Sequence, residues 1–92
     1  EIKNNNDIYS LEQNVPNPSN GETSIFYHIG ANHANAFITI NDLNGREIKR
    51  LSLLHNSQQT IIPKGTLLSG QYIYSLIVDS KIIDSKKMII ME

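Results

Sequence analysis

Apolar residues recur at every second position through most of this chain. The stretch TSIFYHI at residues 23–29, for example, places Ile25, Tyr27 and Ile29 on one face and the intervening side chains on the other. A β-strand has this period, because its successive side chains point to opposite faces, whereas an amphipathic helix repeats every 3.6 residues. No stretch of about a dozen residues keeps the helical period. The sequence therefore predicts an all-β protein without a long helix.

Turn residues divide this pattern into short strands. Asn44-Gly45 between two apolar runs predicts a β-hairpin over residues 36–54, because both residues accept a positive φ. In its second arm Ile48 and Leu51 are three apart, which indicates a β-bulge or an inexact face assignment. Seven short strands at such spacing favour an antiparallel two-sheet sandwich. The expected strands lie at residues 8–14, 23–29, 36–43, the second arm up to 54, 60–62, 71–78 and 82–90, with a turn at 79–81.

The segment NVPNPSNG at residues 14–21 contains two prolines one residue apart, Pro16 and Pro18. Each proline fixes its own φ, lacks an N–H and pushes the preceding residue towards extended geometry, so the segment is neither helix nor central strand. Asn20-Gly21 then supplies a turn that tolerates positive φ. We expect this corner to carry the chain from the edge of one sheet to the other sheet without joining a hydrogen-bonded ladder.

Length and charge exclude several classes of protein. The 92 residues allow one domain, and 8 basic against 9 acidic side chains give a net charge of −1, which does not favour nucleic acid or an anionic membrane as a partner. No apolar run is long enough to span a membrane, and residues 1–10 do not resemble a signal peptide. The chain begins with Glu1, so we interpret it as a piece of a longer protein, with a linker at residues 1–7 and a domain at 8–92.

The sequence offers no recognisable catalytic or metal site. It contains no cysteine, and its histidines lack metal-ligand spacing; they are His28, His33 and His55. The aspartates beside predicted turns are interpreted as caps of backbone N–H groups; they are Asp42, Asp79 and Asp84. There is also no nucleophile elbow, P-loop or Rossmann glycine pattern. We therefore predict a protein that is not an enzyme and holds no cofactor or metal.

Three of the tyrosines alternate with residues of the opposite face. Tyr27, Tyr72 and Tyr74 are therefore predicted to pack in the core rather than to form a carbohydrate-stacking platform. In LLSGQY, Gly70 precedes Tyr72 at the start of a strand, which is the spacing of a tyrosine corner. We expect the Tyr72 hydroxyl to bond a backbone group between residues 66 and 70.

The order of four motifs resembles a known family. LEQNVPNPSNGETSIFYHI, ITINDLNGREI, LLSGQYIYSLI and KKMII follow one another over about residues 11–91. This series is similar to the type A C-terminal sorting domain of type IX secretion cargo from Bacteroidetes. Asn41 departs from the family, which often has an aromatic residue there. The motif positions, which the resemblance identifies as candidates for recognition by the translocon or the sortase, are Asn17, Pro18, Asp42, Gly45, Arg46, Gly70, Tyr72, Lys86 and Lys87.

The resemblance implies an immunoglobulin-like sandwich that acts as an export address. The outer-membrane translocon and its shuttle components would recognise the domain in the periplasm, and a cysteine-protease-like sortase would remove it and join the cargo to anionic lipopolysaccharide. The cargo would precede it in the same chain and finish at the cell surface or outside the cell, with no membrane insertion. Among the motif residues, Gly45 and Gly70 suit backbone geometry and Arg46 can pair with Asp42. Lys86 and Lys87 are adjacent in a strand, so at least one should face solvent.

A second interpretation remains open. The domain could be a fibronectin-like accessory sandwich that spaces domains or binds a glycan on a surface enzyme. Such a spacer can have sequence after it, whereas a sorting signal resembling this family is expected to end its protein, as KKMIIME does here.

Overall fold

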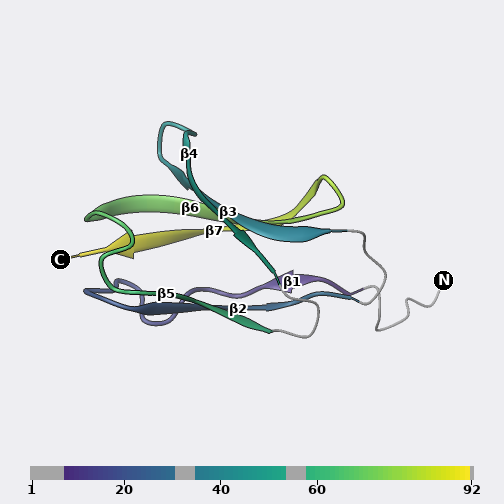
Figure 1. The fold of residues 1–92 in the computed structure, drawn as a ribbon, viewed down its shortest axis with the longest axis horizontal. Coiled ribbons are helices and arrows are strands. Elements are labelled where there is room, and N and C mark those ends of the chain that lie inside the picture. The colour runs from purple at the N-terminus through teal and green to yellow at the C-terminus, as the bar shows by residue number, and fades with distance from the viewer. Residues whose placement is uncertain (1–7, 31–34, 54–57, 92) are drawn as a thin grey trace.

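The computed structural model describes residues 8–30, 35–53 and 58–91, and within these ranges the chain forms seven strands and no helix. They form two antiparallel sheets with the orders β1-β2-β5 and β4-β3-β6-β7, which Figure 1 shows as two stacked layers with β4 rising away from the upper one. The predicted antiparallel, immunoglobulin-like β-sandwich is confirmed. The strands are β1 (Ser10–Leu11), β2 (Thr23–His28), β3 (Ala36–Asp42), β4 (Glu47–Ser52), β5 (Gln59–Ile62), β6 (Gly70–Val78) and β7 (Lys81–Ile90).

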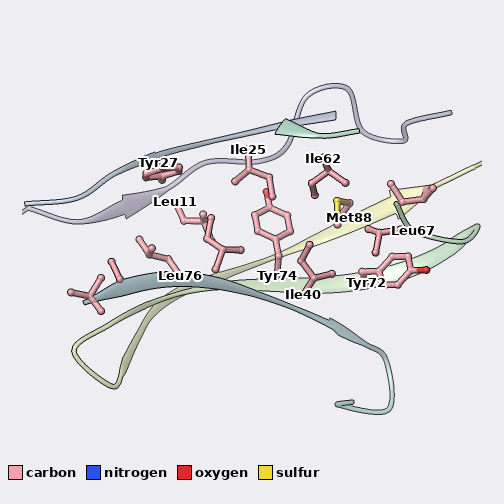
Figure 2. Close-up of a cluster of buried hydrophobic side chains, with 14 residues drawn as sticks. Leu11, Ile25, Tyr27, Ile40, Ile62, Leu67, Tyr72, Tyr74, Leu76 and Met88 are labelled. Carbon is pink, nitrogen blue, oxygen red and sulfur yellow. The ribbon is translucent and has the colours of Figure 1, made fainter. Parts of the chain in front are cut away.

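The core lies between the sheets and is built from the alternating apolar positions. Figure 2 shows Tyr74 reaching from β6 into the space between the layers, towards Ile25 of β2. Tyr27 and Tyr72 are also buried, so the prediction that these tyrosines pack in the core is confirmed. The buried apolar side chains are Leu11, Ile25, Tyr27, Ala36, Ile38, Ile40, Ile62, Leu67, Tyr72, Tyr74, Leu76, Val78, Met88 and Ile90.

The β3–β4 hairpin has the predicted bulge but not the predicted two-residue turn. The register shifts between Ile40 and Asn41, which leaves Ile48 as the extra residue of β4. At the turn only Gly45 has a positive φ, of 87°. The Gly45 N–H donates to the Asp42 carbonyl at 3.0 Å, and the Asp42 N–H donates to the Arg46 carbonyl at 2.9 Å. This is a type I turn followed by a left-handed glycine, the usual three-residue hairpin loop.

The β6–β7 hairpin uses the two-residue turn instead. Asp79 and Ser80 both have positive φ, 48° and 70°, and Val78 pairs with Lys81. Positive φ at both central residues is the type I′ geometry, which matches the twist of the two strands. The expected turn at residues 79–81 is therefore one residue shorter, and β7 begins at Lys81.

The proline corner does not cross between the sheets. It joins β1 to β2, and these two strands are paired in the same sheet, Leu11 opposite Tyr27. The first strand is also shorter than the expected residues 8–14, because the chain leaves the ladder after Leu11 and pairs again only at Val15, opposite Ser24. Both X-Pro peptide bonds of the corner, at Pro16 and Pro18, are cis.

The corner is held by polar side chains rather than by a positive φ at Gly21. Asn14 is almost fully buried, and its Nδ2 donates to the Pro16 carbonyl at 3.1 Å and to Thr23 Oγ1 at 3.0 Å. The Ser19 hydroxyl bonds the Gly21 carbonyl at 3.0 Å and accepts the Gly21 N–H at 3.2 Å. Local side-chain bonds of this kind give the backbone an alternative to a ladder.

Candidate recognition surface

Most of the motif positions lie at one end of the sandwich. Asp42 at the end of β3 is opposite Tyr72 near the start of β6, and Gly70 is opposite Ile90 at the end of β7. The start of β2 lies there too, because Thr23 pairs with Ile62 at the end of β5. We call this the motif end; it consists of Asp42, the connections at residues 13–22, 43–46 and 63–69, Gly70, Tyr72 and Met91. Figure 1 shows it on the side of the C-terminus.

Asp42 organises the β3–β4 turn. Its Oδ1 accepts the N–H groups of Asn44 and Arg46, each at 2.9 Å, and its Oδ2 lies 3.4 Å from Arg46 Nε. The predicted Asp42–Arg46 pair is therefore present. The Arg46 side chain is 79% exposed, so the ion pair is worth less than about 1 kcal/mol. The backbone caps, rather than the ion pair, fix the shape of this turn.

Tyr72 forms the predicted tyrosine corner. Its hydroxyl donates to the Leu68 carbonyl at 2.6 Å, and the side chain is buried. A Cβ built on Gly70 would lie 3.8 Å from the tyrosine ring, so the glycine is in van der Waals reach of it. The corner fixes the connection between β5 and β6.

Asn17 has a partner that the sequence did not reveal. Its Oδ1 accepts the Ile89 N–H of β7 at 2.9 Å. The neighbouring Ser19 donates its N–H to the Ile89 carbonyl at 2.9 Å and accepts the Met91 N–H at 2.7 Å. Gln13 Nε2 adds a bond to the Lys87 carbonyl at 2.6 Å.

These bonds cover the outer edge of β7 near its end. The prediction that the corner joins no ladder is therefore wrong, because a proline removes only its own N–H and Ser19 keeps one to donate. The roles of Gln13, Asn14 and Ser19 were missed in the sequence. The available signal was an uninterrupted run of polar side chains around the two prolines.

The two lysines of the last motif face different ways. Lys87 is exposed and lies opposite Ile73 on the outer face of the sheet. Lys86 is half-buried opposite Tyr74, on the face of the core, and its Nζ lies 3.5 Å from Asp84. The expectation that at least one faces solvent is confirmed. Asp84 lies within β7 rather than beside a turn, although its carboxylate does accept a backbone N–H, that of Ser85 at 2.8 Å.

A hollow of about 430 Å³ lies on the outer face of the four-stranded sheet. Phe37 is the aromatic residue in its lining, and its ring is covered by Arg50, whose Cζ lies 4.3 Å from the ring centre. Arg50 is held in turn by Glu47 at 2.9 Å. A sugar stacking on Phe37 would have to displace this arginine, so the hollow does not favour the glycan-binding interpretation.

Other predicted residues are placed less informatively. His28 is exposed on β2, while His33 and His55 lie outside the described residues. Within the described ranges, no three His, Asp or Glu side chains gather as a metal site would require. No helix suited to crossing a bilayer occurs in that part of the chain either. The Asp79 carboxylate accepts the Asn35 N–H at 2.9 Å, as expected for a turn aspartate.

The fold and the motif end define a small immunoglobulin-like domain with recognition motifs but no catalytic constellation. Comparison with protein families matches residues 15–91 to the secretion system C-terminal sorting domain. The chain belongs to this family, that of the type IX secretion sorting signals, as the motif order indicated. Members of the family are sorting signals and not catalysts. Comparisons with curated proteins and with solved structures gave no match.

Proposed function

We propose that this domain directs a cargo protein, carried in the same chain, through the type IX translocon across the outer membrane. The observation that carries the proposal is the family match over residues 15–91, which includes every motif position. Shuttle components and the translocon are the proposed partners during export. A cysteine-protease-like sortase then removes the domain, and the cargo is released or anchored at the cell surface.

The motif end supports this role physically. Four separate stretches of the chain place motif residues on one end of a rigid sandwich, which a partner could contact together. Arg46 and Lys87 are the exposed charged members of the set, whereas Tyr72 is buried and acts on the backbone. A signal that is read in the folded state needs such a fixed arrangement, because contacts that are already ordered cost less entropy on binding.

The experiment is a fluorescent reporter with a signal peptide, fused to this domain and expressed in a host with type IX secretion. We expect the reporter at the cell surface or in the medium, and accumulation in the periplasm when the domain is deleted. Delivery without the domain would refute the sorting function. Loss of the sortase should leave the fusion uncleaved, which tests the processing step separately.

The lysines are tested in the same assay. Lys86→Ala with Lys87→Ala should unfold at nearly the native midpoint, because exposed and half-exposed substitutions usually change stability by no more than about 0.5 kcal/mol. If the lysines are read by the export machinery, this variant accumulates in the periplasm. Normal surface delivery would remove them from the recognition surface while leaving the sorting function intact.

A further inference from the structure

Three large apolar side chains are exposed at the motif end. Leu43 is 59% exposed, Leu68 is 82% exposed and Met91 is 56% exposed. Leu43 directly follows β3, Leu68 precedes β6 by two residues and Met91 directly follows β7. The strand register places all three at the same end of the four-stranded sheet. Single exposed apolar residues are ordinary on protein surfaces, so exposure alone requires no explanation.

The notable feature is that a motif residue fixes the backbone beside each of them. The Leu68 carbonyl accepts the Tyr72 hydroxyl at 2.6 Å. The turn that presents Leu43 is capped by Asp42 at the two following N–H groups that flank Gly45.

The same holds for the third side chain. The Met91 N–H donates to the Ser19 carbonyl at 2.7 Å, in the segment whose Asn17 accepts the Ile89 N–H. All three apolar side chains are therefore presented from backbone held by a motif residue or its direct neighbour. Side chains ordered in this way lose less entropy when a partner buries them.

The charges at this end indicate the kind of partner. Asp42 and Glu22 are balanced by Arg46 and Lys64, and Asp42 is paired with Arg46 at 3.4 Å. Attraction to an anionic lipid surface would require an excess of basic residues. A charge-balanced end with three fixed apolar side chains is complementary to a protein surface with apolar pockets and little net charge.

We propose that Leu43, Leu68 and Met91 are the contact residues of the sorting signal, and that they insert into apolar pockets of a protein of the export machinery. Asp42, Tyr72 and Asn17 are positioning residues that hold these three side chains in place. The proposal rests on the proposed sorting function and names the surface through which it is read.

The decisive variant carries Leu43→Ser, Leu68→Ser and Met91→Ser. Its matched control carries three serines at exposed isoleucines away from the motif end, Ile48, Ile61 and Ile82. Burial of an aliphatic side chain at an interface changes affinity by about tenfold or more, so we expect surface delivery of the reporter to fall at least that much in the first variant and to persist in the control. Normal delivery of the first variant overturns the proposal, as does equal loss in both.

Two further measurements keep the result interpretable. Leu68→Ser alone removes the most exposed of the three side chains and should reduce delivery with an unchanged unfolding midpoint; unchanged delivery counts against the proposal. Delivery of a reporter that lacks the whole domain would instead refute the sorting function. The purified domain should sediment as a monomer and should not bind vesicles of phosphatidylcholine with phosphatidylglycerol. Self-association or vesicle binding that the triple variant abolishes would assign the surface to a second copy or to lipid and overturn the proposal.

The positioning role is tested by comparing variants of equal stability. Tyr72→Phe removes the bond to the Leu68 carbonyl, whereas Ile25→Val trims the core far from that carbonyl. Delivery is compared at temperatures where the two variants have the same folded fraction. We expect a larger loss for Tyr72→Phe, because Leu68 is then less well fixed. Equal delivery would show that Tyr72 contributes stability only.

Discussion

Tyr74 links the two sheets through a single buried hydroxyl. The side chain extends from β6 across the core, is fully buried, and donates its hydroxyl to the Glu12 carbonyl at 2.7 Å, just after β1. Burial disfavours the charged phenolate and raises the pKa of Tyr74 from 10.0 to about 12. Replacing Tyr74 by Phe keeps the ring and removes both the hydrogen bond and the titrating group.

These two effects have opposite signs on the pH scale. At pH 7 the variant should be less stable by about 0.5 to 1.5 kcal/mol, the net worth of one hydrogen bond. Above pH 10 the unfolded wild-type chain loses the Tyr74 proton while the folded protein keeps it until about pH 12. Deprotonation therefore stabilises the unfolded state, and the wild type loses up to about 2.7 kcal/mol across this interval. The variant does not, so its disadvantage should vanish near pH 10.7 for a bond worth about 1 kcal/mol and then reverse.

Urea unfolding of both proteins at pH 7, 10 and 11.5, followed by circular dichroism, measures this crossing. Lysines and the other tyrosines titrate in both proteins and largely cancel in the difference. A free-energy difference between variant and wild type that stays constant from pH 7 to 11.5 would refute the account of a neutral, buried Tyr74 hydroxyl. An unchanged stability at pH 7 would refute the value assigned to its hydrogen bond.

Three further changes test the motif end. Tyr72→Phe should lower the free energy of unfolding by about 0.5 to 1.5 kcal/mol, and an unchanged midpoint in urea would contradict the tyrosine corner. Asn17→Ala should cost a similar amount of about 1 kcal/mol and speed hydrogen exchange at the Ile89 amide, which then loses its acceptor; unaltered protection of that amide would contradict the edge contact. Gly45→Ala should destabilise by about 1 to 2 kcal/mol because φ is 87° there, whereas Gly21→Ala, with space for a Cβ and no positive φ, should be neutral or slightly stabilising; equal effects of the two in thermal unfolding would exclude backbone strain as the cause.

The fold could be predicted because its main signals are local. A period of two assigned Ile25 and Tyr27 to the core, and the Gly70 and Tyr72 spacing located a tyrosine corner that the structure confirms at 2.6 Å. The turn types could not be predicted in the same way. Turn geometry depends on how the flanking strands pair, and Asp79 accepted the positive φ that the sequence suggested for Asn44.

The path of the proline corner was not predictable from its own residues. Rigid backbone at Pro16 and Pro18 excludes helix and central strand, but it does not say which sheet receives the next strand. That choice depends on the pairing of β1 with β2 and on the distant edge of β7, to which Asn17 and Ser19 are bonded. Contacts that join residues about seventy positions apart leave no periodic trace in a sequence.

The management of the sheet edges supports a recognition surface made of side chains. An exposed edge strand can pair with another chain through its backbone, and proteins block this with bulges, charges or covering segments. The edge of β4 carries the bulge at Ile48 among charged residues, and the last part of β7 is covered by Asn17 and Ser19. Strand addition is thereby disfavoured at both edges of the four-stranded sheet near the motif end. Recognition there must use side chains, and the exposed ones with the most apolar surface to bury are Leu43, Leu68 and Met91.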